Sequence, residues 1–303
     1  MAVDIIKTIG DSVMAPFRDM QLLLVLVLWG IVVFAIGYLS LPSIFNAVYS
    51  LSAAAYSSPT AIIGSVFSLL SIVAVLMVAS IIIGVFFTNM VLAKAFYGKK
   101  YSLEKAASFA ISRYLSVFGT EILLFILFLV VPALVIGVVA IASSALGVLL
   151  MFLYIIFAIY AAVKLSVSIP AALVGKKNPV EAIKYSWTIT ANKWWTLFAT
   201  FLAIFIIALI ITYIASIPSS MILRHGIASQ ISNYATPTTA TGNSSALLGS
   251  VFTAMKSNVH TTSYAIADLI TQIVGVVMQS WLMISTILIY GQLAPKSKTK
   301  NSK

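Results

Sequence analysis

The sequence predicts an all-α, polytopic integral membrane protein with six transmembrane helices, interfacial amphipathic helices and parallel internal repeats. Three observations support this class. Hydrophobic residues make up 61% of the chain and charged residues only 8%, whereas a soluble domain carries about 25% charged residues. The apolar residues form runs of the length that crosses a bilayer, roughly 20 residues. Sixteen of the 18 lysines and arginines fall in segments that would lie on one side of the membrane.

Residues 1–19 are predicted to form an interfacial helix, because charged residues alternate with spaced apolar ones. The apolar positions are Ile6, Ile9, Val13 and Phe17. A cleaved signal peptide is the alternative, but the charged part lacks a positive bias and no small-residue cleavage site follows. The first span is therefore predicted over Met20–Leu41, and the uncharged segment Pro42–Pro59 is predicted to be an outer loop.

The second span is predicted over Ala61–Tyr97, a run that is longer than a bilayer requires. At about 1.5 Å per residue it would project past the inner surface, where Asn89 and Lys94 would lie. Gly98 ends this run and is followed by Lys99 and Lys100.

A second amphipathic segment, Ser102–Ser116, precedes a third span over residues 117–142 that carries Glu121 near its inner end. Residues 143–147 predict a tight outer turn. The fourth span, over residues 148–174, carries Lys164 where its side chain can extend towards the inner interface.

The stretch 175–200 organises the rest of the chain. Gly175 is predicted to end a helix in the left-handed conformation. Asn178 is predicted to cap the next helix, with Pro179 in its first turn and Glu181 three residues after the cap. Val180, Ile183 and Trp187 share one face of that helix. Trp194 and Trp195, beside Lys193, predict an interfacial anchor at the start of the fifth span, 194–216.

Residues 217–262 are predicted to form a polar outer loop. Asn243 begins a glycosylation sequon there, which requires an exterior position. The sixth span, 263–293, completes a single membrane domain over residues 1–293, and residues 294–303 form a basic cytoplasmic tail. Six spans with both termini cytoplasmic place every basic cluster on the same side.

An internal repeat is indicated by two similar stretches, one starting at Gly98-Lys99-Lys100 and the other at Gly175-Lys176-Lys177. Each leads into an amphipathic helix and then an outward span. The N-terminal segment suggests a third unit, so the predicted units are 1–98, 99–175 and 176–293. Parallel repeats in membrane proteins frequently enclose a site at their interface.

These same residues resemble the glycerophosphodiester phosphodiesterase membrane domain family, including its stand-alone prokaryotic relatives. The similarity lies in Gly175-Lys176, Glu181-Ala182, Ser186 and Trp194-Trp195, with a weaker copy from Gly98 to Ser112. In the family such a domain can be fused to a soluble phosphodiesterase barrel that carries the catalytic residues. Nothing in this chain corresponds to the barrel, so the resemblance implies a prokaryotic membrane module without phosphodiesterase activity.

Few residues in this sequence are of the types and spacings typical of catalytic sites. The histidines, His225 and His260, have no cysteine and no nearby acidic pair beside them, so neither a metal nor a cofactor is predicted. Ionisable or amide groups within the spans are the candidates for a pathway through the membrane. They are Asp268, Gln272, Gln279, Glu121 and Lys164. Packing is the alternative and favoured role for these groups, with the glutamines hydrogen-bonding neighbouring helices.

The basic residues beside the amphipathic segments are predicted to attract anionic lipid headgroups, each contributing about 1 kcal/mol near such a surface. They are Lys99, Lys100, Lys105, Lys176, Lys177 and Lys184. The net charge of +11 also suggests nucleic acid, but its one-sided distribution favours the positive-inside rule.

The function predicted from the sequence is a non-enzymatic scaffold or lipid-interacting module of the cell membrane. A transporter or channel subunit, as the membrane part of a larger import or export machine, is the alternative. Both are compatible with partners in a membrane complex or with a homo-oligomer.

Overall fold

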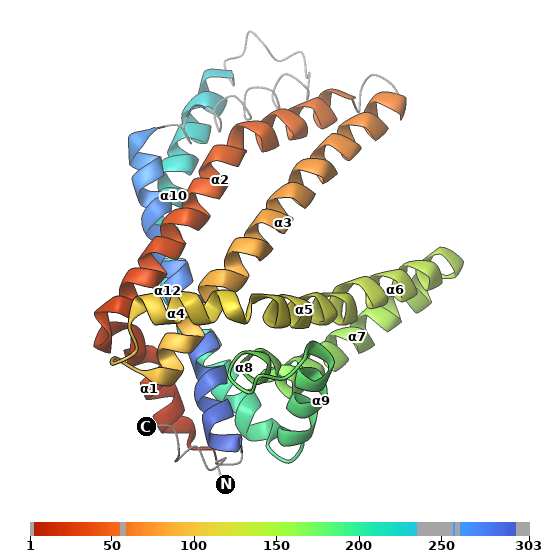
Figure 1. The fold of residues 1–303 in the computed structure, drawn as a ribbon. Helices are drawn as coiled ribbons and strands as arrows, with labels where there is room; N and C mark the ends of the chain where they lie inside the picture. Colours follow the sequence, from red (N-terminus) through yellow and green to blue (C-terminus); the bar gives the residue numbers. More distant parts are fainter. Residues whose placement is uncertain (1–2, 55–58, 235–256, 258–260, 295–303) are drawn as a thin grey trace. The chain divides into compact units, whose positions relative to one another are not determined.

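The computed structural model describes residues 3–54, 59–234, 257 and 261–294, and within these ranges helices joined by short turns are found, without strands. The chain divides into two compact units. Unit 1 comprises Met1–Val25, Val85–Ile207 and Gln279–Lys303; unit 2 comprises Leu26–Gly84 and Ala208–Met278. Figure 1 shows the helices with their labels.

Six helical stretches among the described residues are long and apolar enough to cross a membrane, which confirms the predicted fold class. They are Met20–Leu51, Thr60–Tyr97, Tyr114–Ala142, Ser144–Leu173, Trp194–His225 and Thr262–Leu293. The helices that contain them are α2 (Met20–Ala54), α3 (Pro59–Tyr97), α5 (Tyr114–Phe125) with η1 (Ile126–Val130) and α6 (Val131–Ala142), α7 (Ser144–Leu165) with α8 (Ser168–Leu173), α10 (Trp194–Tyr234) and α12 (Thr262–Leu293).

Two predicted helix ends were wrong. Helix α2 continues through Pro42 to Ala54, and α10 continues through Pro218 to Tyr234, so residues 42–54 and 217–234 are helical where loops were predicted. A proline removes one backbone hydrogen bond but does not end a helix whose neighbouring residues remain apolar, and such prolines are tolerated in spans. Residues 235–256, which include Asn243, lie outside the described residues, as does the tail from residue 295.

Three short helices of unit 1 begin with the same local arrangement. They are α1 (Ile5–Arg18), α4 (Leu103–Ser112) and α9 (Pro179–Ile189). The side chains of Asp4, Ser102 and Asn178 cap them by accepting the backbone N–H three residues later. The cap at Asn178 confirms the prediction made for the stretch 175–200.

The same three helices also pack in the same register. The fourth and eighth residues after each cap are small and buried. These residues are Thr8 and Ser12 in α1, Ala106 and Ala110 in α4, and Ala182 and Ser186 in α9. Small side chains allow close approach of neighbouring helices, so each short helix is attached to unit 1 by its least bulky face.

Several bulky apolar residues of the short helices are exposed instead. Ile6 is 85% exposed and Phe17 61% in α1, while Val180 is 51% exposed in α9. A soluble protein would bury these side chains, whereas a protein in a bilayer leaves them in contact with lipid.

The turns before α4 and α9 differ in a way that corrects one prediction. Gly98 adopts the left-handed conformation with φ 76°, whereas at the second turn, where Gly175 was predicted to adopt it, the left-handed residue is Lys176, with φ 54°. A Cβ at Gly175 would lie 2.5 Å from both the Ala171 carbonyl oxygen and Tyr290 Oη. Gly175 is therefore required for close packing, and the conformational role falls to its neighbour.

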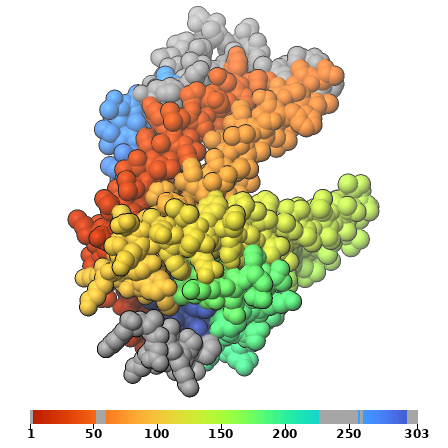
Figure 2. Space-filling model, in the orientation of Figure 1, coloured from red at the N-terminus to blue at the C-terminus, as the bar shows by residue number. Residues whose placement is uncertain are grey.

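The third and fourth spans form an antiparallel hairpin, in which α6 and α7 lie side by side (Figure 1). The turn is tight, as predicted, because Ser143 alone separates the helices and caps α7. Pro132 removes the hydrogen bond normally made to the carbonyl of Phe128, and that carbonyl accepts the Tyr154 hydroxyl of α7. Figure 2 shows the tip of this hairpin at the surface, and side chains near it such as Val138 and Ile141 are exposed.

Unit 2 contains a close contact between α2 and α12. A Cβ at Gly30 would lie 2.7 Å from the Cα of Ile273, so glycine allows the two helices to approach. Thr271 donates its hydroxyl to the Ala215 carbonyl of α10 at 3.0 Å. Small residues and side-chain-to-backbone hydrogen bonds thus hold these spans together, as expected where hydrophobic burial provides little driving force.

Candidate functional site

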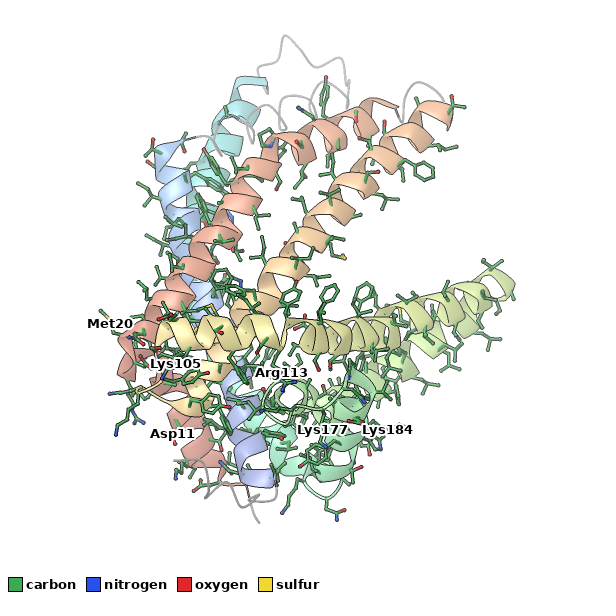
Figure 3. All side chains as sticks on the ribbon, in the orientation of Figure 1. Asp11, Met20, Lys105, Arg113, Lys177 and Lys184 are labelled. Carbon is green, nitrogen blue, oxygen red and sulfur yellow. The ribbon has the colours of Figure 1, made fainter. Side chains whose placement is uncertain are left out.

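The lysines predicted to contact lipid headgroups all belong to unit 1, as does every described basic residue except Arg224. Five of the six predicted lysines are exposed: Lys99, Lys100, Lys105, Lys176 and Lys184. Figure 3 shows Lys105, Arg113, Lys177 and Lys184 among the short helices, away from the tip of the α6–α7 hairpin. Unit 1 therefore concentrates its positive charge where its short helices also present apolar side chains.

Lys177 is the half-buried member of this group. Its Nζ lies 4.5 Å from the ring centroid of Tyr185, a cation–π arrangement. Burial raises the pKa of the Tyr185 phenol above 10.0, so the ring stays neutral at physiological pH. The Lys177 backbone carbonyl accepts the Ser116 hydroxyl at 2.8 Å, which connects the start of α9 to α5.

An open pocket of about 840 Å³ lies between α7 and the beginning of α10, and we call it the aromatic pocket. Its lining combines apolar residues of α7 and α10 with the polar turn between α9 and α10. The lining residues are Ile156, Ile159, Tyr160, Ala191, Asn192, Lys193, Trp194, Trp195, Thr196 and Phe198. The side chain of Trp194 donates from Nε1 to the Tyr160 carbonyl oxygen at 3.1 Å and holds the two helices together. The pocket thus offers a hydrocarbon wall beside a single ammonium group.

The side chain of Lys164 was predicted to extend towards the interface, but it is buried. It is 4% exposed, and its Nζ lies 5.7 Å from the Tyr160 ring centroid and 5.4 Å from that of Trp187. Its backbone carbonyl accepts the hydroxyls of Ser186 at 2.8 Å and Thr190 at 2.9 Å. Both hydroxyls are buried, one in α9 and one directly after it, so the backbone of Lys164 joins α9 to α7.

Glu121 lies half-buried in a second pocket of unit 1, an open pocket of about 320 Å³ that we call the Glu121 pocket. Residues from α3, α5, α7, α10 and α12 and from the segment around α8 line it. They are Thr88, Leu92, Glu121, Ala162, Val163, Ser166, Ile169, Phe201, Leu282, Met283 and Thr286. Neither pocket places Glu121 and Lys164 together, and the two form no ion pair at 4.0 Å or less.

Asp268 and Gln272 of unit 2 lie four residues apart on α12, and the Gln272 side chain interacts with the Asp268 carboxyl. Both are half-buried, whereas Gln279 is exposed and belongs to unit 1. The structure therefore brings together two of the five residues predicted as candidates for a pathway. In the part of the chain that is described, no three histidine, aspartate or glutamate residues come together as they would to hold a metal ion; His260 lies outside that part.

A buried ion pair was missed by the sequence analysis, which placed Lys94 beyond the inner surface. Lys94 is 1% exposed, and its Nζ lies 3.1 Å from Asp19 Oδ2, 2.8 Å from Gln21 Oε1 and 2.6 Å from the Tyr101 carbonyl oxygen. Asp19 follows α1 and precedes α2, so the pair joins that junction to the end of α3. The residues around Asp19 and around Lys94 in the sequence do not indicate this pairing, because the two partners are far apart in sequence.

In comparisons with known proteins, no family model, no curated protein and no solved structure matches this chain. The resemblance to the glycerophosphodiester phosphodiesterase membrane domain therefore stays a prediction that rests on the residues quoted for it.

Proposed function

We propose that this protein is a non-enzymatic, multi-pass module of the cell membrane that binds anionic lipid headgroups through the basic surface of unit 1. In this proposal both termini are cytoplasmic, and the chain consists of three repeat units. The identical register of cap and small residues in α1, α4 and α9 supports the repeat.

The observation that carries the proposal is the outward orientation of bulky apolar residues on the three short helices. A helix with exposed apolar side chains and flanking lysines matches the bilayer interface, where hydrocarbon and charged headgroups meet. In α9, Val180 and Trp187 are exposed together with Lys184. Each lysine near an anionic surface adds about 1 kcal/mol of attraction.

The lining of the aromatic pocket supports a binding site for an individual lipid molecule. Ile156, Ile159 and Phe198 provide a surface for an acyl chain, and Lys193 provides a positive charge for a phosphate. Tyr160 and Trp194 stack with ring centroids 5.7 Å apart, as aromatic side chains at membrane interfaces commonly do.

Native mass spectrometry of the full chain in mild detergent, titrated with phosphatidylglycerol or phosphatidylcholine, tests the proposal. We expect preferential binding of phosphatidylglycerol. Lys193→Gln should reduce the tightest bound lipid, and Lys176→Gln combined with Lys184→Gln should reduce the weaker ones. Arg224→Gln is the matched control, since this exposed arginine belongs to unit 2. Equal occupancy by both lipids, or equal losses in the control, would contradict the proposal.

A transport role is the second candidate, supported by the Asp268–Gln272 pair within a span. A polar side chain within a membrane span raises the free energy of the folded protein unless it has a partner or a role in binding a solute. Loss of solute flux in Asp268→Asn vesicles with unchanged protein yield would support transport, whereas unchanged flux would leave the pair a packing feature.

A further inference from the structure

The Glu121 pocket contains an acidic side chain in a predominantly apolar environment. The pocket lies entirely within unit 1, and its lining includes one ionisable residue, Glu121, and no lysine or arginine. Within the described residues, ion pairs form at Arg18–Asp11 and Lys94–Asp19, and neither includes Glu121. Tyr114, on the same helix, interacts electrostatically with Glu121, but a neutral phenol does not balance a carboxylate charge.

The other polar side chains of the pocket are hydroxyls whose protons are already donated elsewhere. Ser166 donates to the Val163 carbonyl at 2.8 Å and Thr286 to the Met283 carbonyl at 2.7 Å. Thr88 makes a weak bond to Met283 Sδ at 3.9 Å. What these oxygens still offer is lone pairs, so the pocket presents acceptors and negative charge but few donors.

From this arrangement we propose that the Glu121 pocket binds an organic cation, an ammonium group attached to a hydrocarbon or aromatic body. The carboxylate balances the positive charge, and the apolar walls accommodate the body. Phe201 supplies a ring for contact with the cation, and Met283 supplies a polarisable thioether. A volume of about 320 Å³ is at the small end of ligand pockets, which favours a compact amine.

Two alternative occupants fit less well. An inorganic cation such as Ca²⁺ or Mg²⁺ needs about six or more oxygen ligands, and one carboxylate with three hydroxyls does not provide them. An anionic ligand would meet the carboxylate without a compensating base. This proposal is independent of lipid-headgroup binding at the basic surface, because the two involve different residues and opposite charges.

The test is equilibrium dialysis of labelled benzyltrimethylammonium against the full chain in nanodiscs of a neutral glycolipid, which carries no ammonium group. Neopentylbenzene, the neutral molecule of the same shape, is the comparison ligand. We expect saturable binding of the cation and at least about tenfold weaker binding to Glu121→Gln, because the charge-assisted contact is lost. Phe201→Leu should weaken binding about threefold through loss of the ring contact. Glu104→Gln, an exposed carboxyl of α4 outside the pocket, is the matched control and should bind like the unaltered protein.

Thermal melting of each variant in the same nanodiscs separates binding from folding, since glutamine has the shape of glutamate. Cation binding that is unchanged in Glu121→Gln would overturn the proposal, as would equal binding of neopentylbenzene. Replacing part of the glycolipid with phosphatidylethanolamine distinguishes the natural source of the ammonium group. Competition by this lipid assigns the pocket to a lipid amine, and absence of competition assigns it to a free amine.

Discussion

The side chain of Lys94 is buried against Asp19, with Nζ 3.1 Å from Oδ2, in a chain whose other described lysines are mostly at the surface. The same carboxylate accepts the backbone N–H groups of Gln21 and Leu22 through Oδ1, at 3.1 and 3.4 Å. Asp19 therefore caps α2 and also balances the positive charge of Lys94 at the end of α3. One residue at the junction of α1 and α2 is thus joined to the end of α3.

Lys94→Met is expected to destabilise the protein by about 3–5 kcal/mol, because the carboxylate of Asp19, 13% exposed, would lose its partner. The measurement is reversible unfolding in mixed micelles. Lys105→Met, at an exposed position, should change the free energy of unfolding by less than about 0.5 kcal/mol.

The double variant Asp19→Asn with Lys94→Met should be more stable than Lys94→Met alone. Asparagine keeps the cap on Gln21 and carries no charge that needs a partner. Additive losses from the two substitutions would show that the ion pair is not coupled.

The side-chain caps give a second prediction. Asn178→Ala should cost about 1 kcal/mol, because Asn178 Oδ1 accepts the Glu181 N–H at 2.8 Å. Ser102→Ala should cost a similar amount at α4, whereas Ser108→Ala, exposed in the same helix, should be nearly neutral. Equal effects of the two serine substitutions in thermal melting would contradict the cap.

Gly175→Ala should destabilise unit 1 by about 1–3 kcal/mol, the usual cost of overpacking. The added Cβ would meet both a backbone oxygen and Tyr290 Oη, so combining it with Tyr290→Phe should restore only part of the loss. Gly137→Ala is the control, since nothing lies within 4 Å of its added Cβ. That helix-interior change should be neutral or stabilising by about 0.5–1 kcal/mol, and a comparable loss would contradict the packing argument.

Helix α1 packs against unit 1 through its small residues and exposes bulky ones, which gives a fourth prediction. Ser12 is fully buried, and Ser12→Leu should destabilise the attachment of α1 by about 1–3 kcal/mol through overpacking. Met14 is 49% exposed, so Met14→Leu should have almost no effect on unfolding. Proteolysis of the N-terminal segment in micelles measures the attachment. Faster cleavage of the Met14 variant than of the Ser12 variant would reverse the assigned faces.

The sequence by itself determined the membrane class, the six apolar helices and the start of α9. These properties follow from local composition: an apolar run of sufficient length becomes a span, and Asn178 with Pro179 is enough to start a helix. Helix ends were less predictable, because Pro42 and Pro218 act as breaks in water but are accommodated within apolar helices.

Tertiary structure alone decided which face of each short helix touches the protein. Amphipathic periodicity separates Phe17 from Ser12 but does not state which side is protein and which is lipid, since lipid also accepts apolar side chains. Tertiary structure also decided that Lys94 meets Asp19, that Lys164 lies between Tyr160 and Trp187, and that Glu121 faces a pocket without a base. These outcomes depend on distances between residues far apart in sequence, which only packing of the helices sets.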